Sequence, residues 1–183
     1  MRLKSILILL VILLALGGYF YYAYVMPRPV VKPEPKVPVW SVDVAVLRQV
    51  TIKLPREQKG QTFVMEGEGE NATWYFDGAG RSAVDKNRWG GIPVLVSQPR
   101  PERIIAENAT AEKLAAFGLT QPLMEITLTM ENKDSLRITI GDKTPDGHAF
   151  YAQVPGSTNV ATVDITWYQV IERLVREPPY AQP

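Results

Sequence analysis

The first two dozen residues contain a long apolar segment. Residues 6–25 read ILILLVILLALGGYFYYAYV and include no charged side chain. At 1.5 Å per residue a helix of this length spans roughly 30 Å, the thickness of the hydrocarbon core of a bilayer. Two basic residues precede the segment, and an aromatic band ends it, as expected at the headgroup level. The pattern predicts a transmembrane signal anchor over residues 1–26.

The residues expected to form this anchor are Ile6, Leu10, Leu14, Gly17, Gly18, Tyr21, Tyr22 and Val25. A cleaved signal peptide is the alternative, because Ala15-Leu16-Gly17 places small residues at the spacing that a signal peptidase uses. The apolar segment continues well beyond Gly17, which favours the uncleaved anchor. The basic residues before the helix favour a cytoplasmic N-terminus and an extracytoplasmic domain at the cell membrane.

Residues 27–39 form a different kind of segment, PRPVVKPEPKVPV, with five prolines in thirteen positions. Proline fixes φ and lacks a backbone donor, so the segment is expected to be an extended, semi-rigid linker. At about 3.1 Å per residue it would reach roughly 40 Å from the bilayer.

Residues 40–177 show the alternation of a folded β-rich domain. Over 124–131 apolar residues alternate with glutamate and threonine, which predicts a half-buried strand, and residues 136–140 return antiparallel to it. Further strands are expected at 150–154 and 160–163. Asp164 is expected to cap a final helix with an apolar stripe, and residues 178–183 form a tail. The predicted fold class is α+β, an antiparallel meander with two or three short helices packed on it.

The first half of this domain shows weaker patterns. Strands are expected at 42–54, 62–66 and 72–76, and a short one at 103–106. In the stretch 82–98 we expect one or two helical turns, a break at two glycines and an extended exit through Leu95 and Val96. A helix over 109–117 is expected to stop at Gly118 in the left-handed conformation.

The composition of the chain limits which ligands the domain is expected to bind. The net charge is +1, with 20 basic and 19 acidic residues, which gives no sign of nucleic-acid binding. The chain has no cysteine and a single histidine, His148, so zinc and haem sites built on paired imidazoles or thiolates are not expected. We expect no cofactor and no metal.

Three local patterns are candidate sites. Residues 142–147 (DKTPDG) faintly resemble a calcium loop, but a tight turn between strands explains them better. Glu66, Glu68 and Glu70 are expected to form a solvated hairpin tip rather than a cation site. His148 with Ser82, Ser97, Ser135 or Ser157 would suit a hydrolase, although no Gly-x-Ser-x-Gly elbow is present.

The four tryptophans at 40, 74, 89 and 167 are expected to be core residues or surface anchors. Trp89 stands beside Arg88 and two glycines. The side chains of Arg88 and Trp89 are the expected partner contact if they are exposed.

Two motifs carry a family resemblance, GLTQP at 118–122 and ITIGDKTPDGHAFYAQV at 138–154. Their matching residues are Gly118, Leu119, Pro122, Ile140, Gly141, Asp142, Lys143, Thr144, Pro145, Phe150 and Tyr151. With residues 39–52 and 88–99, they resemble the bacterial domain of unknown function 4340 family. The resemblance implies a membrane-anchored protein, in some cases encoded near transport machinery of the ABC type. It carries over no catalytic residue.

These observations favour a non-enzymatic accessory subunit, anchored in the lipid bilayer, whose domain docks on a larger membrane protein complex. Transport, electron-transfer and photosynthetic complexes are the classes considered. The alternative is an extracytoplasmic binding module for an envelope glycan or peptide, which a concave, partly aromatic pocket would favour.

Overall fold

The computed structural model describes residues 3–22, 38–67, 69, 72–78, 81–99 and 103–180. The chain divides into two compact units, Met1–Pro35 and Lys36–Pro183. Most of the expected linker, and Val25 of the expected anchor, lie outside the described residues.

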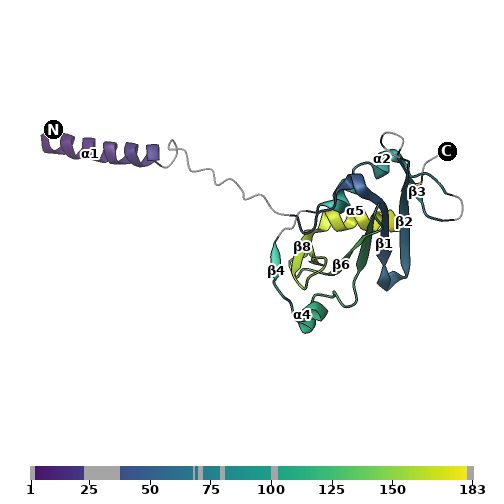
Figure 1. Cartoon of the computed structure of the whole chain (residues 1–183). Helices are drawn as coiled ribbons and strands as arrows, with labels where there is room; N and C mark the ends of the chain where they lie inside the picture. Colours follow the sequence, from purple (N-terminus) through teal and green to yellow (C-terminus); the bar gives the residue numbers. More distant parts are fainter. Residues whose placement is uncertain are drawn as a thin grey trace. The chain divides into compact units, whose positions relative to one another are not determined.

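The first unit contains helix α1 (Leu3–Phe20), drawn in purple in Figure 1. Apolar side chains are exposed along it, from 53% at Ile12 to 71% at Tyr19. Within the described residues, no helix combines the length and the apolar character that crossing a membrane requires.

The second unit is built on an antiparallel sheet of eight strands in the order β3-β2-β1-β5-β6-β7-β8-β4. The strands are β1 (Leu47–Leu54), β2 (Lys59–Glu66), β3 (Thr73–Phe76), β4 (Ile104–Ala106), β5 (Met124–Met130), β6 (Ser135–Lys143), β7 (Ala149–Gln153) and β8 (Val160–Asp164). The helices are α2 (Lys86–Trp89), α3 (Ile92–Ser97), α4 (Ala111–Ala116) and α5 (Ile165–Arg176), with 3-10 turns η2 (Val44–Val46) and η3 (Pro55–Glu57). The predicted α+β class is therefore confirmed.

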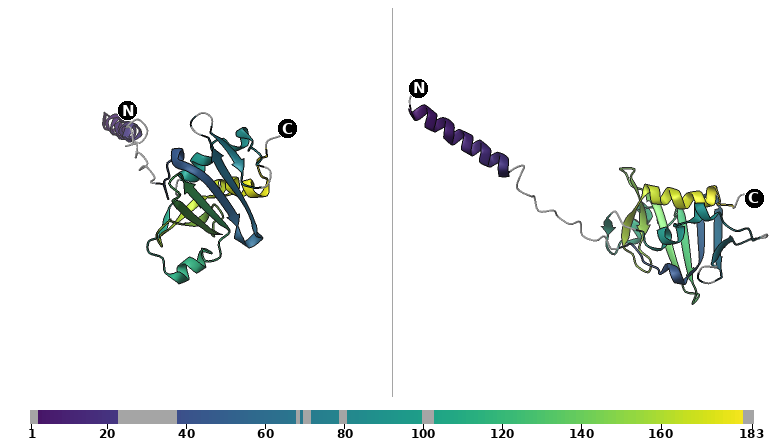
Figure 2. Two further views of the ribbon diagram at one scale, coloured as in Figure 1. Left: turned by 45° about the vertical axis from the view of Figure 1, so that its right-hand side comes forward. Right: turned by 90° about the horizontal axis from the view of Figure 1, so that it is seen from above.

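The alternating pattern sets which face of the sheet is buried. Strand pairing aligns Ile52, Ile126 and Ile138 in one row across β1, β5 and β6, and all three are fully buried. The threonines that alternate with them on β5 are half-buried and face the other side. Helix α5 covers the apolar face, as Figure 2 shows for the yellow helix lying across the sheet.

Helix α5 forms where the sequence predicts it. The Asp164 carboxylate accepts hydrogen bonds from the backbone N–H groups of Thr166 and Trp167, which satisfies two donors of the first turn. One face of the helix is buried in the core, through Trp167, Tyr168, Ile171, Leu174 and Val175. The capping and the apolar stripe together fix the helix on the sheet.

Two local expectations were wrong. Residues 44–46 form the 3-10 turn η2 instead of strand, because the Asp43 carboxylate accepts a hydrogen bond from the Ala45 N–H and closes the turn. Leu95 and Val96 lie in α3 instead of an extended exit. Gly91 adopts φ +84° before α3, and a proline in its first turn suits a helix start.

The topology also departs from a simple meander. Strand β1 pairs with β5, and β4 crosses to the far edge to pair with β8. The pairing β1–β5 therefore joins the N-terminal strands to the C-terminal meander in one sheet.

Candidate functional site

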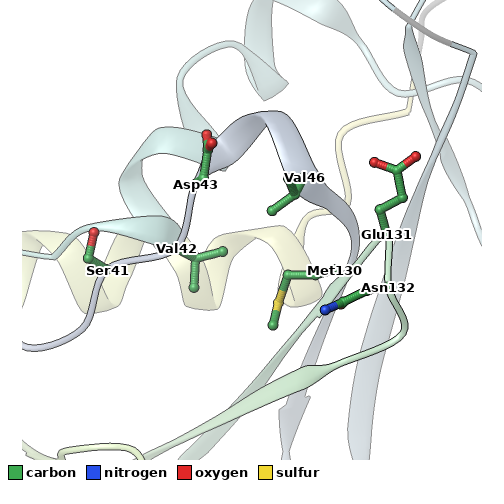
Figure 3. A pocket seen from close by; sticks show the side chains of 7 residues that line it. All are labelled: Ser41, Val42, Asp43, Val46, Met130, Glu131 and Asn132. Carbon is green, nitrogen blue, oxygen red and sulfur yellow. The ribbon is translucent and has the colours of Figure 1, made fainter.

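A groove of about 500 Å³ opens where the chain enters the second unit. Its walls come from two segments far apart in sequence, the stretch around η2 and the turn that follows β5 (Figure 3). The lining residues are Ser41, Val42, Asp43, Val46, Met130, Glu131 and Asn132.

Backbone hydrogen bonds hold the two walls in place. The Val42 N–H donates to the Ser97 carbonyl at 3.0 Å, which ties the entering chain to α3. The Glu131 N–H donates to the Val46 carbonyl at 2.8 Å, which joins the end of η2 to the turn after β5. The groove is therefore part of the folded domain and does not depend on side-chain placement alone.

The floor of the groove is apolar. Val42 is buried, Met130 is half-buried, and Val46 is 37% exposed. In Figure 3 the side chains of Val46 and Met130 point toward Val42 across the opening. Methionine is flexible and polarizable, so a surface that contains it adapts to differently shaped apolar groups.

The margin of the groove carries two carboxylates, those of Asp43 and Glu131. Glu131 forms an ion pair with Arg48 at 2.8 Å. The Arg48 guanidinium also donates to the carbonyl oxygens of Ala45 and Leu47, at 2.7 and 3.3 Å. The Arg48 guanidinium is thus held by protein groups, and the groove has carboxylate side chains at its margin and apolar side chains at its floor.

Sequence reasoning did not find this groove. Residues 42–46 alternate apolar and small or polar side chains, a pattern that predicts a strand. The groove needs the contact between η2 and residues 130–132, which lie more than eighty positions away. Asp43 in front of Val-Ala-Val is a capping signal that indicates the turn, but no local pattern indicates its opposite wall.

Trp89 is a core residue, so it does not meet the condition of exposure under which it would be a partner contact. Trp89 is 4% exposed, and its ring centroid lies 4.3 Å from Phe63 and 5.1 Å from Trp74. Asp85 caps α2 by accepting from the N–H groups of Asn87 and Arg88, and the short helix places the indole in the core.

Arg88 is exposed but already bonded within the domain. Its guanidinium donates to the carbonyl oxygens of Glu177 at 2.7 Å and Pro178 at 3.3 Å. These acceptors follow α5, where carbonyl groups lack intrahelical partners and a cation is favourable. Arg88 therefore ties α2 to the end of α5.

The stretch 142–148 comprises the last two residues of β6 and the turn that leads to β7. Gly147 adopts φ +76° and its N–H donates to the Thr144 carbonyl at 2.9 Å. The Thr144 hydroxyl donates to Asp146 at 2.5 Å, and the His148 N–H donates to the same carboxylate oxygen at 3.2 Å. These bonds, that from Thr144 above all, lower the pKa of Asp146 below its usual value.

The other candidate patterns do not come together. Asp142 pairs with Arg56 at 2.8 Å, and Glu66 pairs with Arg81 at 3.0 Å. Glu68 and Glu70 lie outside the described residues. In the part of the chain that the structure describes, no three acidic or histidine side chains gather to hold a metal ion.

No serine joins His148 in the described ranges. Ser82 and Ser135 are exposed, and Ser97 is fully buried. The Ser157 hydroxyl donates to the Val154 carbonyl at 3.3 Å and accepts from the Asn159 N–H. Among these residues no hydrogen bond links the His148 side chain to a serine.

The two motifs that carry the family resemblance lie against each other. Gly118 follows α4 with φ +72°, and a Cβ there would overlap the Asp142 carboxylate. The Arg56 guanidinium donates to both the Gln121 carbonyl and Asp142. The loop at 118–122 is thus clamped onto the end of β6.

The fold and these motifs define a small α+β domain on an eight-stranded antiparallel sheet. Residues 74–173, more than half of the chain, match the family model described as Domain of unknown function (DUF4340). The chain belongs to this family, as the motifs predicted. The segment 39–52, which also resembles the family, lies outside the matched range. No curated protein and no solved structure matches the chain.

Proposed function

We propose that this protein is a non-enzymatic accessory subunit of a larger membrane protein complex. The N-terminal helix anchors it in the cell membrane with its N-terminus in the cytoplasm, and the α+β domain docks on the complex outside. Transport, electron-transfer and photosynthetic complexes are the classes of partner. The uncharged apolar segment over residues 6–25 carries this proposal.

The exposure of α1 supports the anchor. Consecutive positions of a helix are rotated by about 100°, so residues 10–14 already point to all sides. Each apolar side chain among them is more than half exposed. Such a helix has no polar face to turn toward water, and burial of apolar surface is favourable by about 25 cal/mol per Å². The apolar segment continues to Val25, beyond the described part of the helix.

The groove supports docking by the domain. It is apolar at its floor and polar at its margin, which is the anatomy of a protein contact site. Its first lining residue, Ser41, lies two positions after the end of the expected linker. A domain tethered to the membrane can reach a partner protein that lies in the same membrane.

An extracytoplasmic peptide-binding module is the second candidate, since the groove is concave. The seven residues that line it include no aromatic side chain. A glycan module would use aromatic rings for stacking, so this composition favours a protein segment over a glycan.

Two experiments on native membranes test the proposal. Alkaline carbonate washing should leave the protein in the membrane pellet, and its release into the supernatant would contradict the anchor. Purification in mild detergent should then recover stoichiometric membrane subunits with the full-length chain. Recovery of the chain alone after gentle extraction would contradict the accessory role and favour the peptide-binding module.

A further inference from the structure

We propose that the groove lined by Ser41–Val46 and 130–132 binds a segment of a different membrane protein in which an apolar side chain lies within about three residues of a lysine or arginine. This inference rests on the proposed docking function and names the site and the chemistry of the contact.

The floor of the groove selects the apolar side chain. Val46 and Met130 lie on one side of the opening, and their side chains point toward Val42 across it (Figure 3). The volume of about 500 Å³ falls within the range of about 300–1,000 Å³ found for ligand pockets. An apolar side chain placed there removes exposed surface of Val46 from water, and Met130 adjusts to its shape.

The margin selects the cation. The Asp43 carboxylate accepts a hydrogen bond from the Ala45 N–H at 2.9 Å through one oxygen. An ionised carboxylate has about four acceptor positions, so Asp43 keeps capacity for an incoming donor. Glu131 is bound by Arg48, and that guanidinium also binds two backbone carbonyls. A lysine or arginine on the partner therefore meets an acidic margin that its charge complements.

Two other occupants fit the groove less well, one because of its charge and the other because of its symmetry. Anionic lipid headgroups would be repelled by the Asp43 carboxylate, and Arg48 is already bound by Glu131 and two carbonyl oxygens. A second copy of the chain offers Arg103 beside Ile104, which is 54% exposed on the edge strand β4. That contact would join two different surfaces of the protein. Repeated from copy to copy, it would build an open filament unless the rotation between neighbouring copies closed a ring. A different protein is the occupant that we propose.

Site-specific photo-crosslinking tests the inference in native membranes on the full-length chain. The substitution Val46→benzoylphenylalanine places the probe in the groove. The matched control is Val94→benzoylphenylalanine on α3, because Val94 is 59% exposed and does not line the groove. Mass spectrometry identifies the crosslinked segment.

We expect one main adduct from position 46, in at least about fivefold greater yield than from position 94. It should map to a segment of another membrane protein with the apolar and basic residues described. Asp43→Asn keeps a side-chain oxygen to cap Ala45 but removes the charge. It should lower the yield about two- to fivefold, as expected for an exposed ion pair.

An adduct on lipid, on Arg103 or Ile104 of a second copy, or on a segment without a cation would overturn the inference. Equal yields from the two positions would also overturn it. If membrane subunits co-purify with the chain while position 46 gives no specific adduct, the accessory role stands and the groove proposal fails. If the adduct maps to a segment of the stated chemistry in a protein outside any membrane complex, the accessory role fails and the groove contact remains.

Discussion

The carbonyl oxygen of Phe117 lies directly against the α-carbon of Gly141. A Cβ added at Gly141 would overlap that oxygen, and the carbonyl carbon of Gly118 would lie 3.1 Å away. The Phe117 oxygen also accepts a hydrogen bond from the Asp142 N–H at 2.8 Å. This contact fixes the end of α4 against β6, and it joins the two motifs of the family.

Gly141→Ala should therefore destabilise the fold. The added methyl group meets backbone atoms, which cannot rotate away as a side chain does, so we expect a loss of about 1–3 kcal/mol in the free energy of unfolding. Urea unfolding of the full-length chain in detergent, followed by tryptophan fluorescence, measures this loss.

Gly78→Ala is the matched control for this substitution. Apart from its chain neighbours, no described residue places a heavy atom within 4 Å of a Cβ built at Gly78. Its free energy of unfolding should change by less than about 0.5 kcal/mol. Equal losses for the two variants would show that the contact between Phe117 and Gly141 does not constrain the fold.

The sequence predicted the elements whose signals are local. Strand β5 alternates apolar and polar residues, α5 begins at the Asp164 cap, and Gly118 ends the α4 region in the left-handed conformation. Each of these depends on the backbone preferences and side-chain spacing of adjacent residues. The structure confirms all three.

The contacts that the sequence did not reveal are those between distant segments. The groove depends on η2 meeting the turn after β5, and the burial of Trp89 depends on Phe63 and Trp74 from two strands. A tryptophan beside an arginine and two glycines has the composition of a surface contact. Its environment is set by tertiary packing, which adjacent residues do not specify.

The burial of Trp89 leads to a test that compares tryptophans. Its indole N–H is buried and has no hydrogen-bond partner among the described residues. The indole N–H of Trp40 donates to the Val96 carbonyl at 2.8 Å. Trp89→Phe should therefore destabilise the protein less than Trp40→Phe does. The difference in the free energy of unfolding should be about 1–3 kcal/mol, because only Trp40→Phe leaves a buried acceptor unpaired.

Thermal and urea unfolding of the two variants measure this difference. Trp89→Ala is the control for packing, and it should cost about 3–5 kcal/mol because it removes a whole ring from the core. If Trp89→Phe proved as damaging as Trp40→Phe, the indole N–H of Trp89 would have to bind a group in the folded protein.

The hydrogen bonds of Arg88 distinguish a structural role from a partner contact. Arg88→Met removes the donors to Glu177 and Pro178 but keeps an unbranched side chain. We expect a loss of about 1 kcal/mol in the free energy of unfolding. Recovery of membrane subunits in mild detergent should remain unchanged.

Lys86→Met on the same short helix is the matched control, because no hydrogen bond of its side chain is present among the described residues. It should leave both stability and subunit recovery unchanged. Loss of the subunits from a folded Arg88→Met variant would restore Arg88 as a partner contact.

The turn between β6 and β7 gives a prediction about acid stability. The Thr144 hydroxyl and the His148 N–H hold the pKa of Asp146 below its ordinary value of 3.8. A carboxylate with a depressed folded-state pKa stabilises the fold above its unfolded-state pKa, and this stabilisation is lost as the pH falls through the folded-state pKa. Asp146→Asn should therefore lower the Tm at about pH 6, and this effect should shrink as the pH falls below 3.8 toward the folded-state pKa.

His148→Ala is the control, because it keeps the backbone N–H that donates to Asp146. It should retain most of the difference in Tm between neutral and acidic pH. Calorimetry of the wild type, Asp146→Asn and His148→Ala at several pH values makes the comparison. The difference in Tm between the wild type and Asp146→Asn could instead stay constant from about pH 6 to pH 2. That result would mean that the charge of Asp146 does not stabilise the turn, because an effect of ionisation must vanish when the carboxylate is protonated.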